Sequence, residues 1–177
     1  MMKGLIAYSS LTGNTKTLAE KLAVGLAELG DWTLVDIKKG ASAQGYDCVL
    51  AGGWIDRAWP DKVAKQWIQA LPKEIPCGIF VTMGAEPSSE HGDRVRANLD
   101  SLLECFKVSL DKAILPGLVD PVLLERVRKM PAQALGENGE SIREQMVAAG
   151  ERSRVATEEE YEEAVAAFRK TIQDKIS

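Results

Sequence analysis

The sequence predicts an α/β fold, a three-layer sandwich around a five-stranded parallel sheet with strand order 2-1-3-4-5. Five strand-like segments alternate along the chain with helix-like segments. The segments 3–8, 46–53 and 75–83 are the most uniformly apolar, which is typical of strands buried on both faces of a parallel sheet. These three strands should be central, and right-handed crossovers place helices on both faces. Ligands then bind beyond the carboxyl ends of the first and third strands.

Periodicity and end signals define the elements up to residue 115. After the strand 3–8, the residues Leu18, Leu22, Leu26 and Leu29 recur at helical spacing, and Gly30 supplies a stop for that helix. The remaining predicted elements are a strand at 32–37, a strand at 46–53, a helix with Pro60 at its first position, a strand at 75–83, a helix from Ser89 and a strand at 107–115.

The chain from 116 to 156 departs from this alternation and is predicted to be a helical and loop insertion. Asp120-Pro121 starts a short helix to about Lys129, residues 132–140 form a loop, and 141–149 form a second short helix. Thr157 and Glu160 then make a capping box before an amphipathic terminal helix. We expect a single domain over residues 1–177, with the insertion at 116–156 and the C-terminal helix at 157–176.

Composition and charge exclude several classes of partner and site. A formal net charge of −4 argues against nucleic acid binding, and no segment approaches a membrane span, so we expect a cytoplasmic protein with neither partner. The three cysteines lack metal-binding spacing, and two of them, Cys48 and Cys77, fall in apolar strands. His91 is the only histidine. We therefore expect no metal site and no catalytic triad.

The turn after the first strand carries the strongest functional signal. Residues 9–15 contain no lysine or arginine, yet Ser10, Thr12, Asn14 and Thr15 can add hydrogen bonds to the free N–H groups at the start of a helix. A P-loop would require a lysine after Gly13, and a dinucleotide fingerprint would require three glycines. Neutral donors favour a bound phosphomonoester cofactor, and the alternative is an ordinary capped helix.

Two further loops reach the same edge of the predicted sheet. Trp54 follows two glycines at the end of a central strand, where its side chain can project into the crevice. Trp59 either reaches the ligand or packs under the next helix, and His91 either reaches the ligand or lies on the first turn of its helix. Gly84 permits close approach of the backbone to a ring. Together the three loops indicate a flat aromatic cofactor with a phosphate tail.

The stretch Ser10-Leu-Thr-Gly-Asn-Thr15 resembles the phosphate loop Ser/Thr-x-Thr-Gly-x-Thr of the flavodoxin family. The resemblance extends over residues 1–115, with the terminal helix as the last helix of a flavodoxin-like fold. It implies non-covalent FMN and one-electron transfer to a redox protein partner. Phosphate contacts carry over to Ser10, Leu11, Thr12, Gly13, Asn14 and Thr15. Flavin-ring contacts carry over to Gly53, Trp54, Ile55, Met83, Gly84 and Ala85, and Asp56 and His91 complete the candidate set.

The chain departs from the family in one respect and resembles a subgroup in others. Flavodoxins typically stack a tyrosine from the third loop on the flavin, but residues 84–92 contain no aromatic residue. The stretches 53–57, 82–91 and 120–131 look like a group of single-domain flavodoxin-like proteins of anaerobic bacteria, some of them named as partners of bilirubin reductase. We expect an electron carrier. One alternative is a small FMN-dependent reductase of a quinone or tetrapyrrole, in which the insertion 116–156 forms a cover over the ring or a partner-docking surface. The other is a cofactor-free adaptor on the same fold.

Overall fold

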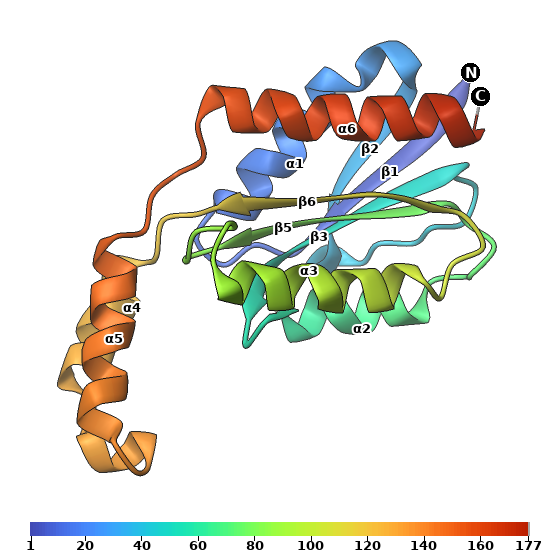
Figure 1. The fold of residues 1–177 in the computed structure, drawn as a ribbon. Coiled ribbons are helices and arrows are strands. Elements are labelled where there is room, and N and C mark those ends of the chain that lie inside the picture. Colours follow the sequence, from blue (N-terminus) through green and yellow to red (C-terminus); the bar gives the residue numbers. More distant parts are fainter. Residues whose placement is uncertain (177) are drawn as a thin grey trace.

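Five parallel strands form the centre of the protein, in the order β2-β1-β3-β5-β6 (Figure 1). Their bounds are β1 (Met2–Tyr8), β2 (Gly30–Asp36), β3 (Cys48–Asp56), β5 (Cys77–Met83) and β6 (Ser109–Pro116). The computed structural model describes residues 1–176. Counted in chain order without the two-residue β4, this is the predicted order 2-1-3-4-5, and the fold class is confirmed.

Four helices cover the two faces of this sheet, and the alternation of side chains along each strand decides which helices they meet. The helices α1 (Asn14–Gly25) and α6 (Glu158–Ile176) lie on one face, and α2 (Lys62–Ala70) and α3 (Glu90–Leu103) lie on the other (Figure 1). Leu5 of β1 belongs to the core beneath α2 and α3, whereas the next residue, Ile6, packs into the core beneath α1 and α6. Both side chains are fully buried.

The predicted start of the second helix is wrong. Pro60 does not open that helix but belongs to β4 (Trp59–Pro60), which pairs antiparallel with the last two residues of β3. The turn between them places Arg57 and Ala58 at φ 51° and 65°, so the chain reverses before the helix begins. Asp61 then caps α2 by accepting a hydrogen bond from the Ala64 N–H. Proline is compatible with both positions because β4 is a short edge strand.

The first helix is also shorter than predicted. It ends at Gly25, and the residues Ala27–Leu29 form a short 3-10 helix, η1. Gly30 therefore begins β2 instead of ending α1. A second 3-10 helix, η2 (Ile37–Lys39), follows β2, and Asp36 caps it by accepting from the Lys38 N–H. Helical spacing of the leucines continues through Leu26 and Leu29, which explains why the sequence pattern does not mark the break.

The segment between β6 and α6 forms a helical hairpin that projects from the sheet (Figure 1). It contains α4 (Pro121–Lys129), the 3-10 helix η3 (Ala132–Leu135) and α5 (Gly139–Glu151). The predicted first helix is confirmed, with Asp120 as its cap and Pro121 at its start. The predicted loop at 132–140 is partly helical, and α5 is longer than the predicted 141–149. None of the helices within residues 1–176 has the length and apolarity needed to cross a bilayer.

An arginine at the end of this hairpin joins three segments of the chain. The Arg154 guanidinium donates to both carboxylate oxygens of Glu86, which follows β5, at 2.8 and 3.1 Å. It also donates to both oxygens of Glu160 in α6 at 2.9 and 2.8 Å. Two bidentate pairs on one guanidinium fix their relative geometry more firmly than single ion pairs. Arg154 therefore anchors the loop after β5 and the end of the hairpin to α6.

This cluster should make stability depend on acid pH. The Arg154 hydrogen bond lowers the pKa of Glu160 from 4.5 to about 2. Because the folded-state pKa is depressed, the stabilisation is complete above about pH 5 and is lost as the pH falls towards 2. We expect Glu160→Gln to be less stable than wild type in urea unfolding at neutral pH, with the difference shrinking between pH 4.5 and 2. A difference that stays constant over this range would contradict the role of the carboxylate.

Candidate functional site

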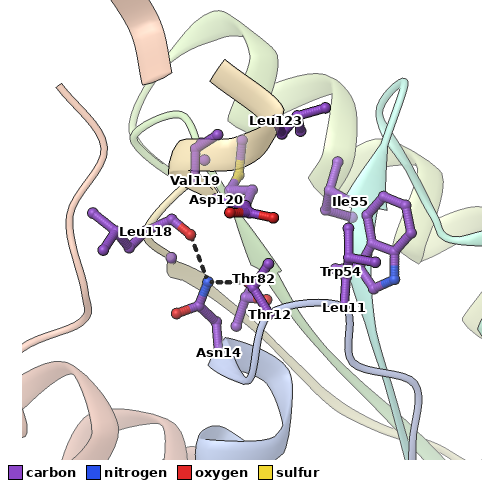
Figure 2. Close-up of a pocket in the computed structure, with 13 residues that line it drawn as sticks. Leu11, Thr12, Asn14, Trp54, Ile55, Thr82, Leu118, Val119, Asp120 and Leu123 are labelled. Carbon is purple, nitrogen blue, oxygen red and sulfur yellow. Dashed lines mark hydrogen bonds between the residues drawn. The ribbon is translucent and has the colours of Figure 1, made fainter. Parts of the chain in front are cut away.

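A surface hollow of about 130 Å³ lies at the carboxyl ends of the strands (Figure 2). It is open, and four separate segments of the chain contribute to it. The lining residues are Leu11, Thr12 and Asn14 after β1, Trp54 and Ile55 of β3, Thr82, Met83 and Gly84 at the end of β5, and Gly117, Leu118, Val119, Asp120 and Leu123 after β6. This is the position where doubly wound α/β folds bind ligands.

The loop after β1 leaves backbone donors free at the start of α1. Gly13 adopts φ 100°, a left-handed conformation that favours glycine, and it precedes the first helical residue. The Ser10 Oγ accepts from the N–H groups of Gly13 and Lys16 at 3.1 and 3.3 Å, which folds the loop back on the helix. Within residues 1–176, the N–H groups of Asn14 and Thr15 have no protein acceptor. Together with the helix dipole, these donors are able to bind an anion.

The side chains of this loop are less free than the sequence suggested. The Thr15 hydroxyl lies 2.8 Å from that of Thr82 and is buried. The Asn14 amide donates to Thr12 Oγ1 at 3.2 Å and to the Leu118 carbonyl at 2.9 Å (Figure 2). Both amide hydrogens of Asn14 are thus used, and the side chain ties the loop to the hairpin. The Ser10 and Thr12 hydroxyls can still donate their own protons to an anion.

A buried aspartate holds the two sides of this site together. Asp61 is 3% exposed. One of its oxygens accepts from the Ser9 hydroxyl at 2.9 Å and from the Ala64 N–H at 3.2 Å, and the other accepts from the Trp54 N–H at 3.2 Å. A single carboxylate thus joins the end of β1, the end of β3 and the start of α2. The sequence pattern does not reveal these contacts of Asp61, although its place directly before a helix is a cap signal.

Trp54 lines the hollow and is partly buried. The Nε1 atom is buried and has no acceptor among the described residues. Trp59 lies elsewhere: its ring is 3.8 Å from the Lys65 ammonium and packs against the core beneath α2. Of the two interpretations of Trp59, the structure therefore favours the core one.

About half of the predicted site residues line the hollow. It brings together Leu11, Thr12, Asn14, Trp54, Ile55, Met83 and Gly84. Seven others do not line it, namely Ser10, Gly13, Thr15, Gly53, Asp56, Ala85 and His91. Asp56 is exposed on the β3–β4 hairpin, and His91 lies in the first turn of α3, where burial and the nearby Arg94 lower its pKa. Gly53 packs over Asp61.

The residues after β6 were missed as part of the site. Residues 117–120 and Leu123 line the hollow. The sequence suggested the insertion 116–156 as a cover over the ring or a docking surface for the reductase alternative, but it singled out none of these residues. Asp120-Pro121 marks a helix start, and nothing in the local pattern indicates that this helix begins beside the first loop. Among residues 1–176, Asp120 is the only ionisable residue that lines the hollow, and its Oδ1 accepts from the Val122 N–H at 2.9 Å. Among residues 1–176, no group of three or more His, Cys, Asp or Glu side chains is arranged to hold a metal.

The comparisons with known proteins agree with this geometry. The sequence matches the family model of the Flavodoxin domain over residues 5–169. The flavodoxin-like domain-containing protein BilS of Clostridioides difficile is 30% identical over 147 residues, 82% of each chain. A short-chain flavodoxin associated with a bacterial microcompartment has a TM-score of 0.54 at 15% identity, over 85% of this chain and 99% of that chain. A Lactobacillus acidophilus flavoprotein in complex with FMN has a TM-score of 0.50 at 17% identity, over 64% of this chain and 93% of that chain. The chain belongs to the flavodoxin family.

Proposed function

We propose that the hollow binds FMN, with the phosphate on the loop 10–15 and the flavin ring beside Trp54. The free N–H groups at the start of α1 carry this proposal, because they can bind an anion and no lysine or arginine among the described residues lines the hollow. The indole supplies a flat apolar surface for the ring. The Lactobacillus acidophilus flavoprotein of similar fold is an FMN complex. When bound, FMN accepts and returns electrons one at a time.

We infer that the protein acts as an electron carrier for a redox protein partner. The hollow is open, and its volume of about 130 Å³ is below the roughly 300–1,000 Å³ of enclosed ligand pockets, so a flavin bound there would be only partly enclosed. An exposed edge suits electron transfer to a partner. In the described part of the chain, Asp120 is the one ionisable residue that lines the hollow, so the described lining offers no acid–base pair for a substrate. These features support a carrier more than an enzyme with its own substrate pocket.

A second candidate function is a small FMN-dependent reductase of a quinone or tetrapyrrole. Exposed leucines beside the hollow favour it, since Leu11, Leu118 and Leu123 are 57%, 47% and 44% exposed. An apolar rim of this kind can hold a flat substrate against the exposed ring edge.

Reconstitution with FMN tests both candidates. The purified chain should take up one FMN and turn yellow, and after chemical reduction it should pass electrons to a one-electron acceptor such as cytochrome c. The loaded protein alone should not consume NADH or NADPH. A chain that stays colourless in excess FMN would refute the proposal, and NAD(P)H-driven reduction of a quinone by the protein alone would favour the reductase.

A further inference from the structure

The hollow has two apolar sides that come from distant parts of the sequence. Trp54 and Ile55 at the end of β3 form one side. Leu118, Val119 and Leu123, at the start of the hairpin, also line the hollow. Leu118 and Val119 lie away from Trp54, and Leu123 lies above Ile55 (Figure 2). A flat ring placed against the indole would therefore meet side chains of the hairpin on its other face.

The loop after β5 supplies backbone but no covering side chain. A Cβ atom on Gly84 would lie 2.5 Å from the Cγ2 atom of Val119. Val119 thus packs directly on the Gly84 backbone, and its side chain occupies the space that a larger residue at position 84 would need. The side chain that stands over this loop comes from the hairpin.

Hydrogen bonds fix the start of the hairpin at this place. The Gly117 N–H donates to the Met83 carbonyl at 2.8 Å. The Leu118 carbonyl accepts from Asn14 at 2.9 Å, and the Val119 N–H donates to the Ser153 hydroxyl at 2.9 Å. Val119 is therefore positioned by the fold before any ligand arrives, which lowers the entropic cost of binding.

Two neighbouring residues of α4 differ in their relation to the hollow. Leu123 lines it and is 44% exposed, so a bound ring would remove apolar surface from water. Val122 is 58% exposed and does not line it. The pair offers a site residue and a matched control within one helical turn.

We propose that Val119 and Leu123 form the second wall of the flavin site, so that the ring lies between the Trp54 indole and two aliphatic side chains. This inference rests on the FMN binding proposed above. The aliphatic wall stands where the third loop offers only Gly84. It gives the hairpin a part in binding the cofactor.

The proposal is tested by titrating the apoprotein with FMN and with riboflavin, which lacks the phosphate. Leu123→Ser should lower the affinity for FMN and for riboflavin by the same factor of about ten, because the wall touches the ring and not the phosphate. Val122→Ser should bind both within about twofold of wild type. Leu123→Met, which keeps an apolar side chain of similar volume, should restore wild-type binding.

Thermal unfolding of the apoproteins serves as the folding control, and an exposed side chain at 123 should leave it unchanged. Two results would refute the second wall while leaving FMN binding intact. In one, Leu123→Ser binds both ligands with wild-type affinity; in the other, it loses affinity for FMN but not for riboflavin. If the wild-type chain binds neither ligand, the proposed function itself fails.

Discussion

Replacing Thr12 by aspartate should lower the affinity for FMN at least about 100-fold while changing riboflavin affinity about twofold or less. Thr12 lines the hollow at the proposed phosphate loop and is exposed. Two unit charges about 4 Å apart at an effective dielectric of 20 repel by about 4 kcal/mol. Screening by salt at this exposed loop reduces the repulsion below that value. A 100-fold loss of affinity requires only about 2.7 kcal/mol of it. Fluorescence titration with both ligands measures the two affinities.

Thr17→Asp is the matched control for this experiment. Thr17 is exposed in the first turn of α1 but does not line the hollow, so it adds the same charge away from the phosphate. We expect this variant to lose less than about fivefold in FMN affinity, since exposed charges are screened over about 10 Å. Equal losses of FMN and riboflavin in Thr12→Asp would show that the phosphate lies elsewhere.

Removing the Asp61 carboxylate should have the largest effect on stability. Asp61→Ala leaves the Ser9 hydroxyl and the N–H groups of Trp54 and Ala64 without their acceptor. Each unsatisfied buried group costs about 1–3 kcal/mol, so we expect a loss of at least about 3 kcal/mol in the free energy of unfolding. Urea denaturation of the apoprotein measures this loss.

Two further variants separate the hydrogen bonds of Asp61 from its charge. Asp61→Asn keeps an oxygen for Ser9 and Ala64 but turns an NH₂ group towards the Trp54 N–H, so we expect an intermediate loss of about 1–2 kcal/mol. Asp56→Ala removes an exposed carboxylate from the neighbouring β3–β4 hairpin and should change the free energy of unfolding by less than about 0.5 kcal/mol. If Asp61→Ala matches Asp56→Ala, the buried carboxylate does not hold the site together.

The sheet could be predicted from the sequence because a strand that is buried on both faces has a recognisable local sequence pattern. A strand in the centre of a parallel sheet has apolar residues at successive positions, as Cys48–Ala51 and Cys77–Val81 do. The ends of elements were harder to predict. Pro60 suits both a helix start and an edge strand, and only the turn at Arg57 and Ala58 made β4 possible.

The loop at the start of α1 was also visible in the sequence, because its backbone geometry depends on consecutive residues. The glycine at position 13, with φ 100°, and the free N–H groups of the next two residues arise from local backbone geometry. The hydrogen-bond partners of its side chains could not be predicted from the sequence. Asn14 donates to Leu118, a residue 104 positions away, and no local pattern reports that partner.

By itself the sequence determined the parallel sheet, the alternation of helices over it and the loop at the start of α1. The tertiary structure decided that the hairpin after β6 reaches the same hollow, that Val119 rests on Gly84, and that Asp61 joins the ends of β1 and β3. Periodicity and capping act between residues a few positions apart, whereas these contacts are set by how the sheet and its connections bring remote segments together.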